Sequence, residues 1–155
     1  MSRGAPVLAI CAAIQVLGHW YETSAGERVE GVGLLDVTTS PQPRRTIGEV
    51  VCTPMAEGLT ETLTGFENHR GGTLLGPGAQ PLAAVVTGAG NRMGDGFDGA
   101  VQGSMVASYL HGPCLARNPE LADLLLCQVV GPLPPLTLPE VDRLRQERLA
   151  APRRV

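Results

Sequence analysis

A short apolar run followed by a helical pattern opens the chain. Residues 6–10 are apolar and include two β-branched residues, which is typical of a buried strand. After Cys11, the residues Ile14, Leu17 and Tyr21 recur at i, i+3 and i+7, and this spacing predicts a helix over 12–22. We therefore expect a strand that turns at Cys11 directly into a helix.

Short apolar segments separated by turn residues fill the middle of the chain. Pro41-Gln42-Pro43 and residues 54–58 interrupt these segments, and prolines and glycines usually end strands. The pattern predicts strands over residues 34–38, 46–53, 60–66, 82–87, 97–101 and 105–110.

Two helices are expected near the C-terminus. Residues 119–129 place three leucines on one face, with Asn118 at the N-cap. Thr137-Leu138-Pro139-Glu140 has a capping-box pattern and begins a charged helix of about a dozen residues, which ends in a frayed tail at Arg153 and Arg154. Together, the strands and helices predict an α/β fold.

Composition narrows the class of protein. The 155 residues suffice for one core, and 43% of them are hydrophobic. The net charge of −3 and the lack of a basic stripe argue against nucleic-acid binding. The four cysteines form no C-x-x-C pair, so we expect free thiols in a reducing cytoplasm and no metal site. Arg3 and the following apolar run resemble a short signal peptide, but Ile10 does not fit a lipoprotein cleavage box.

Cys11 and His111 are the candidate catalytic pair. A cysteine at a sharp strand-to-helix turn is exposed at the apex, near helix N–H groups that favour the thiolate. His111 precedes Gly112-Pro113, so it lies where an element ends, and it could act as the base that a cysteine nucleophile needs. The alternatives are a packed core thiol and a surface-loop histidine.

The motifs around these residues resemble a known family. Cys11 to Gly18 and Ser108 to Gly112 are similar to the nucleophile turn and the histidine motif of class I glutamine amidotransferases of the cobyric-acid-synthase-like branch. The chain between about residues 5 and 126 is similar to the GatD glutaminase subunits within this branch. The further stretches that carry this resemblance are Arg45 to Glu49, Gly65 to His69, Leu75 to Gly78 with Pro81-Leu82, Gly90-Asn91 with Gly94 to Gly96, and Asn118 to Asp123.

The resemblance implies a fold and an activity. It implies a flavodoxin-like amidotransferase sheet over residues 1–135, followed by a charged helix and tail over 136–155. In this family further strands and a Gly-rich loop precede the nucleophile strand, so we expect the first strands of the sheet to be missing here. The implied reaction is hydrolysis of L-glutamine in the cytoplasm. The ammonia would pass to a MurT-like ligase, which binds ATP and Mg²⁺ and amidates lipid II for peptidoglycan synthesis.

The resemblance also implies roles for further residues. Arg45 matches the arginine that engages glutamine, and a guanidinium can hold the α-carboxylate bidentately. Gln15 lies one helical turn after Cys11 and could face the pocket or bond to a neighbouring loop. Where many relatives carry the third triad residue, two positions after the histidine, this chain has Pro113, which implies an acid supplied by the partner ligase.

Two departures leave other functions open. Ala12 and Ala13 replace two family glycines and Ile14 replaces an aromatic residue, so a required positive φ at either alanine would impair the turn. The second departure is the expected loss of the first strands. With both departures, the chain could be a catalytically silent fragment that keeps partner-binding surfaces. It could also be the glutaminase part of a cobyric-acid-type amidotransferase.

Overall fold

A strand, a sharp turn and a helix begin the structure, as the sequence predicts. The computed structural model describes residues 5–134 and 136–150. Strand β1 (Val7–Ile10) ends at Cys11, and helix α1 (Ala12–Leu17) follows immediately. The predicted helix over 12–22 is too long, because Gly18 ends it and packs so closely on Val37 that a Cβ there would lie 2.8 Å from the Val37 carbonyl oxygen.

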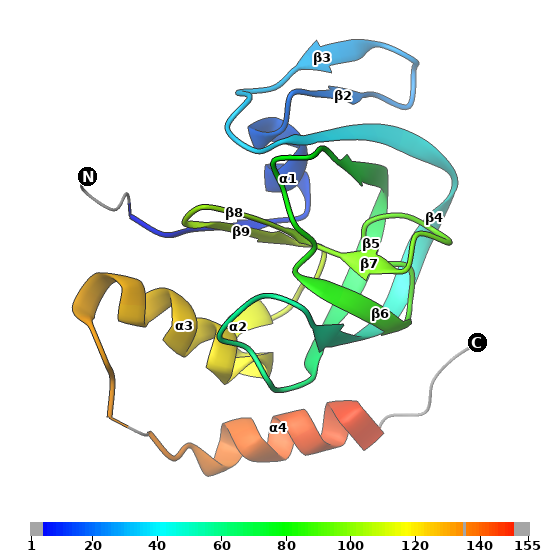
Figure 1. Cartoon of the computed structure of the whole chain (residues 1–155). Helices are drawn as coiled ribbons and strands as arrows, with labels where there is room; N and C mark the ends of the chain where they lie inside the picture. The colour runs from blue at the N-terminus through cyan, green and yellow to red at the C-terminus, as the bar shows by residue number, and fades with distance from the viewer. Residues whose placement is uncertain (1–4, 135, 151–155) are drawn as a thin grey trace.

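The strands form two sheets (Figure 1). A three-stranded sheet has the order β1-β9-β8, and β1 runs parallel to β9, with Ile10 beside Ser108. A second sheet has the order β3-β2-β4-β6-β7, and β5 pairs antiparallel with β4. The remaining strands are β2 (Trp20–Glu22), β3 (Arg28–Glu30), β4 (Val37–Pro54), β5 (Leu63–Leu75), β6 (Ala83–Thr87), β7 (Phe97–Asp98), β8 (Ala100–Gln102) and β9 (Met105–Ser108).

Several predicted strand boundaries are wrong. The predicted strands at 34–38 and 46–53 belong to one strand, β4, which begins at Val37 and continues through Pro41-Gln42-Pro43. The prolines are tolerated because the ladder to β5 shifts register between Pro41 and Thr46. The predicted strand at 60–66 begins later, at Leu63, and the one at 97–101 divides into β7 and β8. The β2–β3 hairpin was not predicted.

Helices cover one side of this arrangement, as Figure 1 shows. They are α2 (Cys114–Arg117), which was not predicted, α3 (Pro119–Val130) and α4 (Pro139–Ala150). Asn118 occupies the predicted N-cap position of α3, but its side chain caps nothing there and instead bonds to the backbone of Thr64 and Cys114. Arg145 fixes α4 to the domain, because it donates to the Arg117 carbonyl at 3.0 Å. The predicted tail at Arg153 and Arg154 lies outside the described residues.

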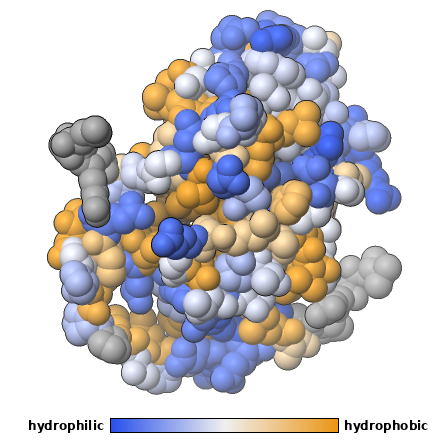
Figure 2. Space-filling model, viewed as in Figure 1, coloured by the Kyte–Doolittle hydropathy of each residue, from blue (hydrophilic) through white to orange (hydrophobic). Residues whose placement is uncertain are grey.

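Two groups of buried side chains form the core. One lies between the helices and the sheets and contains Leu63, Leu82, Leu110 and Leu121, whereas the other surrounds α1. Figure 2 shows hydrophilic residues over the β2–β3 hairpin at the top of this face, hydrophobic residues among polar ones through the middle, and hydrophilic residues again over α4 at the bottom. None of the described helices has the length and apolar character needed to cross a membrane.

Candidate active site

Cys11 occupies a strained turn. Its φ is 55° and its ψ is −113°, and among the described residues it is the one non-glycine residue with a positive φ. The Cys11 N–H donates to the Ser108 carbonyl at 3.0 Å, and the Cys11 carbonyl accepts from the Ile14 N–H at 3.0 Å. Such strain persists only where surrounding contacts hold it, and it is characteristic of an exposed nucleophile between a strand and a helix.

The two alanines after Cys11 fit this turn. Ala12 and Ala13 lie in α1, and neither has a positive φ. The positive φ falls on Cys11 itself, so the glycines of the family are not required for this backbone path. Ile14 is fully buried in the core around α1. The helix-forming preference of alanine therefore suits its place in the first turn.

The start of the helix favours the Cys11 thiolate, as the sequence suggests, but burial outweighs this effect. Burial raises its pKa, whereas a hydrogen bond from the Ala12 backbone and the charge of Arg45 act in the opposite direction. The net direction is upward because half-burial outweighs these two favourable contacts. The thiol thus needs a base to take its proton.

His111 lies beyond the end of the strand next to Cys11. Because β1 and β9 are parallel, their carboxyl ends lie at the same edge of the sheet, and Cys11 and His111 follow these ends. The His111 Nδ1 lies 2.8 Å from the Phe66 carbonyl oxygen. A carbonyl can only accept, so Nδ1 carries the proton, and Nε2 of the neutral ring keeps its lone pair to act as a base.

Arg45 is positioned by the irregular pairing of β4 with β5. Between the Pro41–Gly71 and Thr46–His69 pairs, four residues of β4 face Arg70 alone. Such a bulge bends a strand and redirects its side chains. The Arg45 Nε donates to the Asn68 Oδ1 at 2.6 Å, and the Arg45 charge acts on the Cys11 thiol.

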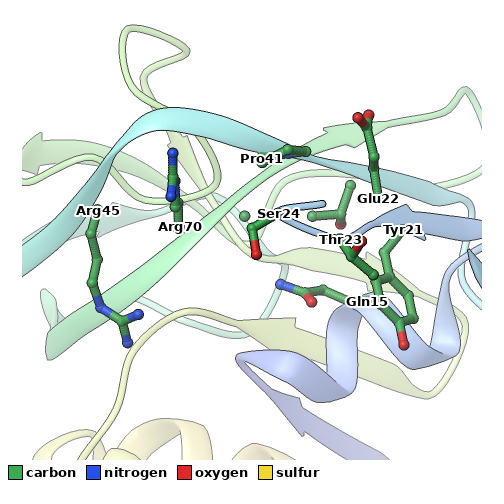
Figure 3. Close-up of a pocket in the computed structure, with 10 residues that line it drawn as sticks. Gln15, Tyr21, Glu22, Thr23, Ser24, Pro41, Arg45 and Arg70 are labelled. Atoms are coloured by element: carbon green, nitrogen blue, oxygen red, sulfur yellow. The ribbon is translucent and has the colours of Figure 1, made fainter. Parts of the chain in front are cut away.

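Arg45 and Gln15 line the same cavity, which has a volume of about 440 Å³ (Figure 3). Arg45 projects from β4 at one end, and Tyr21 and Glu22 of β2 lie at the other. Cys11 and His111 are not among its lining residues. Arg45 therefore shares the cavity with Gln15, and its relation to Cys11 is the effect of its charge on the pKa of the thiol. The complete lining is Gln15, Tyr21, Glu22, Thr23, Ser24, Thr39, Pro41, Arg45, Arg70 and Gly71.

Gln15 lies at the cavity, which is one of the two roles that the sequence left open. It lines the cavity, and its side chain faces the Tyr109 hydroxyl, whose pKa it lowers against the larger effect of burial. The same hydroxyl lies 2.7 Å from the Thr73 Oγ1. Gly71 packs against it, since a Cβ there would lie 2.5 Å from the Gln15 Nε2. Gln15 thus links the helix after Cys11 to the segment that leads to His111.

Several residues of this site are not expected from the sequence. Arg70 lines the cavity, and the Phe66 carbonyl orients His111. Ser108 and Asp98 form a buried pair behind the ends of β1 and β9, with 2.6 Å between the Ser108 Oγ and the Asp98 Oδ2. Ser108 belongs to the histidine motif, so the motif could have indicated a role for it at the site. No sequence pattern relates Asp98 to Ser108.

The sequence matches one protein family over most of its length. Residues 1–119 match the CobB/CobQ-like glutamine amidotransferase domain. A solved structure described as a glutamine amidotransferase has the same fold, with a TM-score of 0.55 and 23% identity over 79% of this chain and 60% of that chain. The expected α/β fold class is therefore confirmed.

Curated relatives include GatD subunits and cobyric acid synthases. The chain is 41% identical to the lipid II isoglutaminyl synthase subunit GatD of Streptococcus pneumoniae, over 75% of this chain and 44% of the relative. It is 39% identical to the GatD subunit of Staphylococcus aureus, over 79% of this chain and 49% of that relative. A probable cobyric acid synthase of Methanothermobacter thermautotrophicus is 38% identical over 72% of this chain and 24% of that relative. The chain thus spans about half the length of the two GatD subunits.

Proposed function

The chain belongs to the CobB/CobQ-like glutamine amidotransferase family, and we propose that it acts as a glutaminase with Cys11 as nucleophile. The observation that carries this proposal is the positive φ of Cys11 at the end of β1, beside the strand that leads to His111. Strained non-glycine backbone at the apex of a strand–helix turn supports a nucleophile more than a packed thiol, because packing alone needs no such strain.

The reaction has two steps. His111 Nε2 removes the thiol proton while the Cys11 Sγ attacks the side-chain carbonyl carbon of glutamine, forming a C–S bond. The C–N bond then breaks, and His111 returns the proton to the departing nitrogen, which leaves as ammonia. Water adds to the thioester carbon in the second step, breaks the C–S bond and releases glutamate, and its proton restores the thiol.

Arg45 would bind the α-carboxylate of glutamine. Its guanidinium lies at one end of the cavity lined by Gln15, and its position is fixed by the bond to Asn68. A planar guanidinium matches a carboxylate with two parallel hydrogen bonds. Gln15 would position the wall of the cavity through Tyr109.

The biological role that we propose follows the GatD relatives. A MurT-like ligase would receive the ammonia, bind ATP and Mg²⁺, and amidate the D-glutamate of lipid II in the cytoplasm. The ligase would also supply the acidic third residue of the triad, because this chain has Pro113 where many relatives carry that residue. A cobyric-acid-type reaction is the second candidate, because the identity to a cobyric acid synthase is nearly as high.

Glutamate release measured with a coupled dehydrogenase tests the glutaminase proposal. The complete subunit with its ligase should release glutamate, and Cys11→Ser or His111→Ala should abolish the release. Cys127→Ser is the matched control, because Cys127 is another partly exposed free thiol and lies on α3. Undiminished release by Cys11→Ser would overturn the assignment, and amide transfer to a corrinoid acid instead of lipid II would favour the second candidate.

A further inference from the structure

Asp98 is a buried carboxylate that the proposed reaction does not use. It is fully inaccessible at the end of β7, behind the ends of β1 and β9. Its Oδ2 accepts from the Ser108 hydroxyl at 2.6 Å, and its Oδ1 accepts from the Tyr109 N–H at 3.3 Å. A buried carboxylate is strongly unfavourable without such donors, so these two bonds account for its being tolerated there.

Ser108 connects this carboxylate to both members of the candidate pair. Its carbonyl accepts from the Cys11 N–H at 3.0 Å, and its hydroxyl accepts from the Leu110 N–H at 2.9 Å. The hydroxyl proton is directed to Asp98, which leaves its lone pairs for Leu110. One serine therefore fixes the backbone of the strained turn and the backbone that immediately precedes His111.

We propose that Asp98, acting through Ser108, is a positioning residue that holds Cys11 and His111 in the geometry for proton transfer. This inference rests on the proposed glutaminase function. The ionised carboxylate accepts from both donors, and charge-assisted bonds are roughly twice as strong as neutral ones. Protonation of Asp98 removes the negative charge, so both bonds weaken, and the oxygen that carries the proton becomes a poor acceptor.

The surroundings make this ionisation accessible to experiment. Burial raises the pKa of Asp98 to about 6, and the charge of Glu67 adds to the shift. The bonds from Ser108 and Tyr109 and the charge of His69 oppose it. Cys52 of β4 and Cys114 of α2 also face Asp98, but burial raises the pKa of each thiol well above the neutral range, so both stay uncharged.

The experiment compares Asp98→Asn with the wild type in the complete complex. Asparagine keeps the size and one acceptor but cannot ionise, so we expect kcat to fall at least about tenfold at neutral pH with KM little changed. An ionisation near pH 6 should disappear from the pH profile of kcat. Asp95→Asn is the matched control, because Asp95 lies in the loop before β7 and pairs with Arg92 at 3.3 Å. Its kcat should equal that of the wild type.

A second readout separates this inference from the glutaminase proposal. The alkylation rate of Cys11 by iodoacetamide, followed by mass spectrometry of its peptide, needs no substrate. The wild type should show an inflection near pH 6 that Asp98→Asn lacks, even if no glutamate is released. Unchanged kcat and alkylation profiles in Asp98→Asn would overturn the inference. If Asp98→Asn has a lower melting temperature and the ratio of its kcat to that of the wild type is the same at every pH, Asp98 has only a structural role and the inference is wrong.

Discussion

Replacing Gly65 by alanine tests whether the approach of β5 to the His111 segment is as close as the structure shows. Gly65 is buried in β5, next to Phe66, whose backbone pairs with His111. A Cβ on Gly65 would lie 2.7 Å from the Leu110 Cα and 2.7 Å from its Cβ. Ordinary contact begins at 3.4 Å, so Leu110 would have to move by about 0.7 Å.

The size of the effect follows from this displacement. Overpacking of a tight site destabilises by about 1–3 kcal/mol. A shift of His111 approaching 1 Å costs up to about 10² in rate, so we expect kcat to fall between about tenfold and 10²-fold. Gly48→Ala is the matched control, because Gly48 is also paired in the β4–β5 ladder and a Cβ there meets nothing within 4 Å.

Urea unfolding measures the loss of stability, and glutamate release by the complete complex measures the loss of kcat. Gly65→Ala should lower both the free energy of unfolding and kcat, whereas Gly48→Ala should match the wild type or gain up to about 1 kcal/mol from a less flexible unfolded chain. Equal stability and equal kcat in the two variants would refute the close packing of Gly65 on Leu110 and the link from it to His111.

Three further predictions concern substrate binding and stability. Arg45→Lys should reduce kcat/KM for glutamine about tenfold or more, since an ammonium cannot form two parallel bonds, and amidation driven by free ammonium should survive; equal loss with both nitrogen sources would make Arg45 structural. The pKa of Asp98 rises from 3.8 to about 6 on folding, so its contribution to stability is full below 3.8 and is lost as the pH rises through 6. Lowering the pH from about 7.5 to about 5 should therefore stabilise the wild type relative to Asp98→Asn by on the order of 1 kcal/mol in urea unfolding, and a pH-independent difference would contradict this shift. Asn118→Ala should lower the unfolding free energy by at least about 2 kcal/mol, because it strands the buried Thr64 N–H and two carbonyls, and a loss below about 0.5 kcal/mol would show that these groups find other partners.

The turn at Cys11 could be predicted because its determinants are local. An apolar run, a small set of side chains around the apex and a following helical pattern all lie within a few residues. The helix end at Gly18 could not be placed in the same way, since Tyr21 continues the helical spacing. The close packing of Gly18 on Val37 ends the helix, and this is a contact between separate segments.

The surroundings of Arg45 and Asp98 depend on tertiary pairing. The prolines at 41 and 43 read as a break between strands, because a proline removes a donor from a regular ladder. Only the register against β5 shows that the strand continues past Pro41 and that Pro43 lies in the bulge that redirects Arg45. Asp98 likewise follows a Gly-rich stretch that reads as a loop, and its bond to Ser108 joins residues that no periodic pattern relates.

Covalent labelling with a glutamine analogue that bears an electrophilic chloroketone tests the central claim most directly. Displacement of chloride by the Cys11 thiol would leave a stable thioether, which mass spectrometry of the digested protein locates. We predict a single adduct on the Cys11 peptide that excess glutamine suppresses and Cys11→Ala removes, with Cys127 unlabelled. Labelling of Cys127 at an equal rate, or labelling of Cys11 that glutamine does not slow, would contradict a glutaminase centred on Cys11.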